Sequence, residues 1–207
     1  GNYVFYKEYY FDPILNESLK KVLKNETGSI KKERTILVYG RPNTPRNSWP
    51  LLLDGLKMWS SCYAHAKAWR IVSAGQEAET IELNNDVIVE NVGKLSLSDY
   101  AAMLKTAYVG ISLMVSPHPS YPPLEMAAFG VKVITNRFSN KNLETFSKNI
   151  ISLESITPEN ICDALCDICD SFTEQFDIDI ENCKEYIMGN NKYPFLNELI
   201  NDIKFGK

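Results

Sequence analysis

The stretch that decides the fold is "VGISLMVSPHPSYPPLEMAAFGVKVITN", residues 109–136. Two apolar runs, 109–116 and 131–136, flank a proline-rich loop and a short apolar helical pattern that ends at Gly130. Such nearly continuous apolar runs are typical of strands buried on both faces of a parallel sheet. A strand, a helix and a second parallel strand make a βαβ unit, which indicates an α/β domain.

The same alternation extends in both directions from this stretch. Further strand-like runs occupy 35–40, 70–75, 86–93 and 149–153, and helical patterns occupy 49–59, 97–104, a segment that starts at Thr157, and 191–203. We therefore predict a Rossmann-like, three-layer α/β/α domain with a parallel sheet of about six strands and a helical C-terminus. We expect residues 31–207 to form this single domain. Residues 1–30, aromatic and then charged, either connect to an upstream domain or pack on the domain's flank.

Composition narrows the class of partner. The chain has 207 residues with 22 basic and 26 acidic side chains, so it carries no excess of positive charge for nucleic acid. It contains no apolar run of about 18 residues, so we predict no membrane span. Five cysteines, an odd number, indicate free thiols and a reducing, cytoplasmic compartment.

Basic residues follow two of the predicted strands. In an open parallel sheet, ligands bind beside the carboxyl ends of the strands, where loops meet helix N-termini. Gly40 ends one run and is followed by Arg41 and, five residues later, Arg46, whose planar guanidinium groups suit phosphate oxygens. Lys94 follows Gly93 after another run, as a mobile point charge for a diphosphate. The alternative is that all three are ordinary surface cations.

The proline-rich loop adds a single carboxylate. Ser116 ends a predicted strand, His118 lies between two prolines, and Pro122 and Pro123 preset the backbone for helix entry. Glu125 then falls in the first turns of the helix and points towards the strand ends. Because a carboxylate only accepts hydrogen bonds, a sugar hydroxyl is its natural partner. The alternative is a carboxylate that serves only the helix dipole.

Three other patterns are interpreted structurally. Cys162, Cys166 and Cys169 have the spacing of iron–sulfur radical enzymes, but they also fall at i, i+4 and i+7 of an apolar helical stripe, which predicts a buried helix. "DID" at 177–179 resembles a metal-binding Asp-x-Asp but lies far from any strand end. His65 is interpreted as a surface or satisfied histidine. We predict no metal site.

The order of the loops resembles a known family. "VYGRPNTPRN" (38–47), "VGKLSLSDYAAML" (92–104) and "SLMVSPHPSYPPLEMAAFGVKVITN" (112–136) together resemble the C-terminal half of a GT-B glycosyltransferase, most closely the WsaF-type rhamnosyltransferases of the retaining family four. The resemblance implies a metal-independent, donor-binding domain of an enzyme that transfers rhamnose from dTDP-rhamnose to a surface polysaccharide at the inner face of the membrane. The acceptor domain would precede Tyr3, and this chain alone would be inactive.

The resemblance also implies residue roles. Arg41 and Lys94 would be catalytic, because they match positions that hold the donor diphosphate and stabilise the leaving group. Glu125 matches the second Glu of the family's E-x7-E motif, which bonds the ribose. The full predicted nucleotide-sugar-binding set is Gly40, Arg41, Arg46, Lys94, Leu95, Ser116, His118, Ser120 and Glu125.

Two positions depart from the family pattern. The first Glu of E-x7-E is replaced by Pro117, and the lysine usual in the Gly-Arg loop is replaced by Asn47, so Lys94 would substitute for it. The second interpretation is therefore a non-catalytic Rossmann-like module for nucleotide binding or protein interaction.

Overall fold

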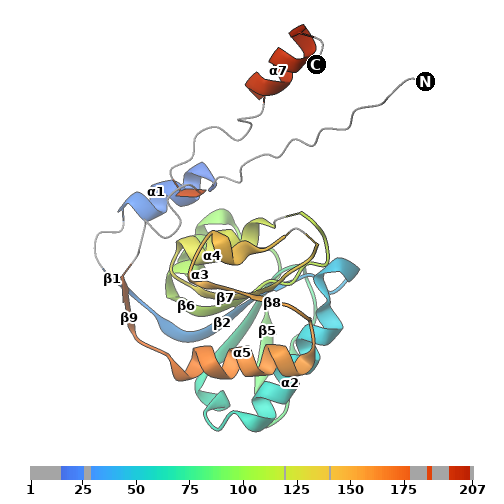
Figure 1. Cartoon of the computed structure of the whole chain (residues 1–207). Coiled ribbons are helices and arrows are strands. Elements are labelled where there is room, and N and C mark those ends of the chain that lie inside the picture. Colours follow the sequence, from blue (N-terminus) through green and yellow to red (C-terminus); the bar gives the residue numbers. More distant parts are fainter. Residues whose placement is uncertain are drawn as a thin grey trace, which may run out of the picture.

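The computed structural model describes residues 15–25, 29–118, 120–139, 141–177, 186–187 and 196–205. Its centre is a seven-stranded sheet between two layers of helices (Figure 1). In spatial order the strands are β4 (Ile81–Glu82), β5 (Ile88–Asn91), β3 (Arg70–Gly75), β2 (Glu33–Gly40), β6 (Ala107–Ile111), β7 (Lys132–Asn136) and β8 (Ile150–Leu153). Every neighbouring pair is parallel except β4 and β5. The predicted three-layer α/β/α fold is confirmed.

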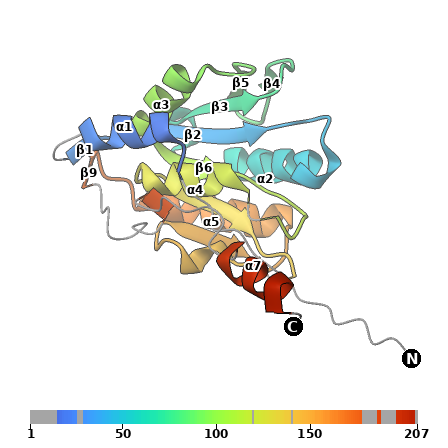
Figure 2. The same ribbon diagram turned by 90° about the horizontal axis from the view of Figure 1, so that it is seen from above.

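The helices divide between the two faces of the sheet (Figure 2). α2 (Trp49–Cys62) and α5 (Pro158–Asp170) cover one face, and α3 (Leu97–Thr106) and α4 (Tyr121–Ala128) cover the other, where α1 (Glu17–Asn25) contacts α3. Along β2, Ile36 and Val38 pack into the α2–α5 layer while Leu37 packs into the α3–α4 layer, because side chains alternate along a strand. Besides these elements, the structure describes a helix near the C-terminus, α7 (Leu196–Phe205), and a separate two-stranded sheet of β1 (Ser29–Lys31) and β9 (Gln175–Asp177).

Two strands, β5 and β6, are clearly shorter than predicted, and three described strands, β1, β4 and β9, were not predicted. The run 109–116 stops pairing as a strand at Ile111, because the side chain of Asn136 then takes over the hydrogen bonds of Met114. That amide accepts from the Met114 N–H at 2.7 Å and donates to its carbonyl at 3.1 Å. The run 86–93 shortens to β5, and β4 is a two-residue edge strand with no pattern to reveal it.

The helix boundaries agree with the capping signals. Ser96 caps α3 by accepting from the N–H of Asp99, and Thr157 caps α5 by accepting from that of Asn160. Gly130, with φ +74°, follows the end of α4 as predicted. Within 1–30, Leu19 is buried against the domain, whereas the aromatic residues 3–11 lie outside the described residues. The domain boundary at residue 31 stays a prediction.

Lys32 is a buried cation beneath the α3–α4 layer. Its Nζ donates to the carbonyls of Leu104 at 3.0 Å and Phe129 at 2.9 Å, which lie at the C-terminal ends of α3 and α4. Those carbonyls lack helical partners and carry the negative end of the helix dipole. One side chain thus satisfies the ends of both helices. Burial lowers its pKa to about 7.

This lowered pKa predicts a pH-dependent stability. A lysine in the unfolded chain titrates near 10.4, so between about pH 7 and pH 10 the unfolded state binds more protons than the folded state. The free energy of unfolding therefore rises with pH across this window, and Lys32 contributes about 2 kcal/mol between pH 7 and pH 9. Urea unfolding at pH 7 and pH 9 should show this rise in the free energy of unfolding for the wild type. In Lys32→Met the rise should be smaller by the contribution of Lys32.

The matched control is Lys31→Met, the exposed neighbour, which should keep the wild-type dependence. An unchanged difference between pH 7 and pH 9 in Lys32→Met would show that Lys32 is not the titrating group.

Candidate functional site

Three strand ends meet at the carboxyl edge of the sheet. Gly40 and Gly75 are register partners at the ends of β2 and β3, and the Gly75 N–H donates to the Gly93 carbonyl at 2.8 Å. Gly75 has φ +138°, and a Cβ on it would lie 2.8 Å from the Gly40 carbonyl oxygen and 3.4 Å from Cγ of Arg41. This junction brings Arg41 and Lys94, which follow different strands, to the same edge.

A cavity of about 530 Å³ opens at this edge. We call it the Glu125 cavity; its lining residues are Tyr39, Ala74, Gly75, Lys94, Leu95, Leu97, Tyr100, Tyr121, Pro122 and Glu125. The ends of β2 and β3 form one side, and the first turns of α3 and α4 form another. The volume lies within the range of about 300–1,000 Å³ that is usual for small-molecule sites. One cation and one carboxylate therefore share an otherwise mainly aromatic and aliphatic lining.

Glu125 is half-buried and faces a tyrosine from the neighbouring helix. Burial raises the pKa of its carboxyl, and the interaction with the Tyr100 hydroxyl opposes that rise. Burial, and then the proximity of Glu125, raises the pKa of Tyr100 well above its usual value. The Tyr100 hydroxyl completes no hydrogen bond of ordinary geometry with the described residues. The pair therefore has hydrogen-bonding capacity left for a ligand hydroxyl.

A second cavity, of about 240 Å³, adjoins the first. We call it the Ser120 cavity; its lining residues are Tyr39, Arg46, Met114, Ser116, His118, Ser120, Tyr121 and Pro122. It shares Tyr39, Tyr121 and Pro122 with the Glu125 cavity, so the two are separated by common walls. The Val115 N–H donates to the Arg46 carbonyl at 2.7 Å and joins the two loops that form this cavity.

Ser120 has an unusual backbone at the start of α4. Its φ of +65° is rare for a residue with a side chain and costs about 1–3 kcal/mol. Its N–H donates to Nδ1 of His118 at 3.0 Å, which leaves Nε2 of that ring as the nitrogen that carries the proton in the neutral form. The Ser120 hydroxyl is buried and has no hydrogen-bond partner among the described residues. Backbone strain and an unpaired buried hydroxyl together make Ser120 a candidate for ligand binding.

The predicted residues divide into three groups. Lys94, Leu95 and Glu125 line the Glu125 cavity. Arg46, Ser116, His118 and Ser120 line the Ser120 cavity. Gly40 and Arg41 line neither.

Gly40 and Asn47 serve packing. A Cβ on Gly40 would lie 1.9 Å from the Ser73 hydroxyl and 3.1 Å from the Trp49 ring, so glycine permits the close packing of β2, β3 and α2 there. Asn47 is buried and donates its amide to the Leu113 carbonyl at 2.9 Å. It thus fastens the Gly-Arg loop to the segment after β6.

The three aromatic walls of the site were not predicted. Tyr39, Tyr100 and Tyr121 line the Glu125 cavity, two of them also the Ser120 cavity. Their position in the sequence offered a signal only for Tyr39, which directly precedes the strand-end Gly40, and for Tyr121, which lies within the proline-rich loop.

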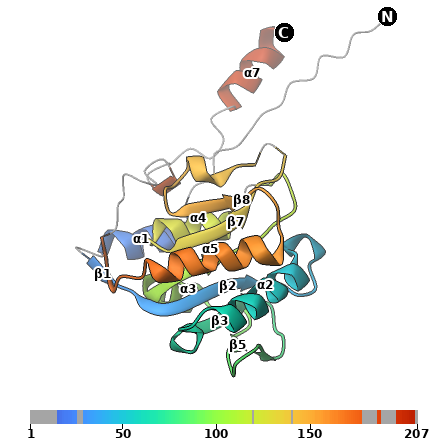
Figure 3. The same ribbon diagram turned by 60° about the horizontal axis from the view of Figure 1, so that its bottom comes forward.

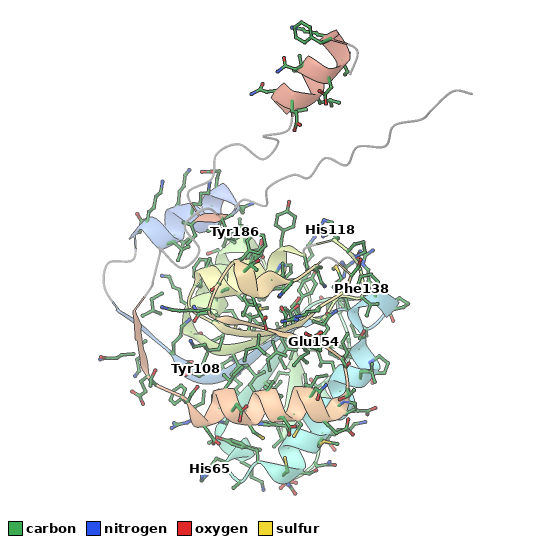
Figure 4. The ribbon with its side chains drawn as sticks, viewed as in Figure 1. His65, Tyr108, His118, Phe138, Glu154 and Tyr186 are labelled. Atoms are coloured by element: carbon green, nitrogen blue, oxygen red, sulfur yellow. The ribbon has the colours of Figure 1, made fainter. Side chains whose placement is uncertain are left out.

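The other candidates lie elsewhere. In the view of Figure 4, the labels of His118 and Phe138, which follow β6 and β7, are towards one end of the domain and that of His65 is towards the opposite end. α5 buries Ile161, Leu165 and Ile168, so the predicted buried helix is confirmed. The "DID" motif was predicted to lie far from any strand end, and this was wrong for Asp177, which ends β9; Asp179 lies outside the described residues. Among the described helices, none combines the length and the apolar character that a membrane crossing requires.

Solved structures show the class of fold. The C-terminal domain of the group 1 glycosyl transferase LpcC from Francisella tularensis matches with a TM-score of 0.50 at 14% identity, over 91% of this chain and 94% of that one. WaaG, a glycosyltransferase involved in lipopolysaccharide biosynthesis, matches with a TM-score of 0.54 at 14% identity, over 92% of this chain and 51% of that one. The fold is that of one half of a GT-B glycosyltransferase.

Sequence comparison shows the family. The family model for the WsaF C-terminal domain matches residues 34–166, and the chain belongs to this family. The O-antigen biosynthesis protein RfbC of Myxococcus xanthus is 33% identical over 133 residues, which are 64% of this chain and 10% of that protein. The chain therefore spans about a tenth of the length of this relative. The predicted resemblance to the C-terminal domain of WsaF-type GT-B glycosyltransferases is confirmed.

The strand-end junction leads to a stability prediction. Gly75→Ala adds a Cβ that meets the Gly40 carbonyl oxygen in a backbone conformation that side chains disfavour, so the free energy of unfolding should fall by about 1–3 kcal/mol. Urea unfolding measures this change. Ser98→Ala, an exposed position in α3, should stay within about 0.5 kcal/mol of the wild type. Equal stability of Gly75→Ala and the wild type would contradict the close approach.

Proposed function

We propose that the chain is the nucleotide-sugar donor domain of a glycosyltransferase. The observation that carries the proposal is the pairing of Lys94 and Glu125 in the lining of one cavity at the carboxyl ends of β2 and β3. A nucleoside diphosphate offers hydroxyls at one end and phosphate oxygens at the other, which matches a carboxylate acceptor and a lysine cation.

The two adjoining cavities support a ligand in two parts. We assign the ribose to Glu125, the base to the segment around Leu95, and the diphosphate to Lys94. The transferred sugar would then occupy the Ser120 cavity, where the Ser120 hydroxyl and Nε2 of His118 can bond its hydroxyls. Arg46 lines that cavity and supplies a second cation for phosphate oxygens.

Catalysis in this proposal is electrostatic and uses no metal. As the bond between the sugar and the diphosphate breaks, negative charge grows on the leaving diphosphate. Lys94, with Arg41 beside Gly75, would stabilise this charge, because cations placed before the reaction lower the barrier without reorganising. Arg41 lies outside both cavities in this structure, so its part requires its flexible side chain to turn towards the ligand.

The substrate and acceptor rest on the family. We propose rhamnose as the sugar, dTDP-rhamnose as its donor, and a surface polysaccharide as the acceptor, in line with the family and with the relative named for O-antigen biosynthesis. The acceptor would be held by a further domain of the parent protein. This chain alone should therefore bind the donor without transferring its sugar.

One observation favours a second candidate, a nucleotide-binding module without turnover. Pro117 replaces the first acid of the family motif, and no acidic side chain is among the described residues that line the Ser120 cavity. An assay of the parent protein with dTDP-rhamnose and a lipid-linked glycan distinguishes the two: rhamnosyl transfer supports the enzyme, and donor binding without transfer supports the module.

The donor site predicts two binding variants. Titration calorimetry with dTDP should show one site, and Lys94→Met and Glu125→Gln should each weaken binding by about 10–100-fold, as expected for the loss of a hydrogen bond to a charged group. Lys67→Met is the matched control, because this exposed lysine lies before β3, at the opposite edge of the sheet. A folded chain that does not bind dTDP or UDP would refute the proposal.

The raised pKa of Glu125 predicts a pH dependence of binding. Only the ionised carboxylate accepts both hydrogen bonds from a hydroxyl pair, so affinity should fall as the pH drops, beginning above the ordinary glutamate value of about 4.3. dTDP-rhamnose is the ligand to use, because its diphosphate lacks a terminal ionisation near neutral pH. Glu125→Gln should bind weakly with an affinity that this titration no longer alters. The same pH dependence in Glu125→Gln would assign it to another group.

A further inference from the structure

Three cysteines meet on the face of the sheet opposite the Glu125 cavity. Cys62 is the last residue of α2, and Cys162 and Cys166 are one turn apart on α5. Their three sulfur atoms lie within 4.8 Å of one another, and the Sγ atoms of Cys62 and Cys162 are 3.4 Å apart. α2 and α5 pack side by side on the same face of the sheet, which is turned forward in Figure 3.

We propose that Cys62, Cys162 and Cys166 form a binding site for a thiophilic d¹⁰ metal ion such as Zn²⁺. Thiolates select such ions over the hard cations that oxygen ligands prefer. An ion bonded to sulfur at about 2.3 Å in tetrahedral or trigonal geometry holds its sulfur ligands about 3.8–4.0 Å apart. The three sulfurs already lie close to that spacing, so binding requires only small side-chain movements.

The burial of the three residues fits a site that an ion can enter. Cys62 is exposed, Cys166 is half-buried and Cys162 is buried, so the cluster opens to solvent at the end of α2. A water molecule can take the fourth position from that side. Burial raises the pKa of the Cys162 thiol and raises that of the Cys166 thiol to about 11, so an ion must displace the protons of these two thiols.

Cys169 distinguishes a site from ordinary core cysteines. It lies on the same helix, is buried, and belongs to the sequence pattern of residues 162–169, yet its sulfur is not part of the cluster. Cys62, which comes from 100 residues earlier in the chain, takes that place instead. The cluster is therefore produced by the packing of α2 on α5, and an ion there would fasten the end of α2 to α5.

Cadmium titration tests the site. Reduced protein with Cys183→Ser, which removes the one cysteine outside the described residues, is freed of metal with a chelator and titrated with Cd²⁺. We expect thiolate-to-cadmium ultraviolet absorption that saturates at one equivalent and is displaced by Zn²⁺. Because the loss of an outer partner alone costs about 10–100-fold in metal affinity, Cys62→Ser should weaken binding by more than 100-fold.

Cys169→Ser, made in the same Cys183→Ser background, is the matched control and should bind Cd²⁺ as that background protein does. Cys169→Ala replaces it if the serine variant does not fold. Zn²⁺ should also raise the melting temperature of the Cys183→Ser protein and leave that of the Cys62→Ser variant unchanged. Three results would overturn the proposal: no thiolate-to-cadmium absorption, an equal loss of affinity in the Cys169 variant, or an unchanged affinity in Cys62→Ser.

Discussion

The structure depends on the way in which β2, β3 and the segment after β5 end together. Gly40, Gly75 and Gly93 bring three backbones so close that a Cβ on Gly75 would meet the Gly40 carbonyl. The Gly75 N–H then donates to Gly93 across the gap. Because the strands are parallel, each chain leaves this junction on the same side, and the residue after each glycine is delivered to one edge. The cation at Lys94 and the stem of Arg41 owe their positions to this contact.

The Glu125 cavity at that edge also depends on how the helices α3 and α4 are positioned. Lys32 donates to the carbonyls of Leu104 in the last turn of α3 and of Phe129 at the C-cap of α4, the two helices whose first turns line the Glu125 cavity. A buried cation is costly, and here two helix C-termini offset the cost with hydrogen bonds and dipoles. The same contact positions α3, which carries Tyr100, relative to α4, which carries Glu125. The geometry of the site thus rests on an interaction at the far end of both helices.

Much of the fold could be predicted from residues because local signals agreed with tertiary structure. The runs 35–40 and 70–75 are largely buried strands, and Thr157 caps α5 at the predicted start of the helix. The run 109–116 was predicted too long because its pairing ends at Asn136, a residue distant in sequence. Apolar periodicity reports burial, and the residues up to Leu113 are buried, but it cannot report which hydrogen bonds a side chain takes over.

Candidate site residues could be predicted where a single loop supplies them. They could not be predicted where the site depends on the packing of two elements against each other. Lys94, Glu125 and Ser120 could be identified because each follows a strand or begins a helix. The Tyr100–Glu125 pair could not, because it depends on how α3 packs on α4. Cys62 is the same case on the other face: its approach to Cys162 follows from the close crossing of α2 on α5, where a Cβ on Gly55 would lie 2.7 Å from Ile161.

Ser120 joins the fold and the site most directly. Its strained backbone turns the proline-rich loop into α4, so the same residue sets the first turn that carries Glu125 and the position of the His118 ring. Natural proteins keep such strain where the surrounding structure enforces it, and here Pro122 and Pro123 restrict the chain on one side. This chain therefore has a rigid residue, Pro117, at the position where the E-x7-E motif has its first acid. Recognition of the sugar would then depend on hydroxyl and imidazole groups held by a fixed loop.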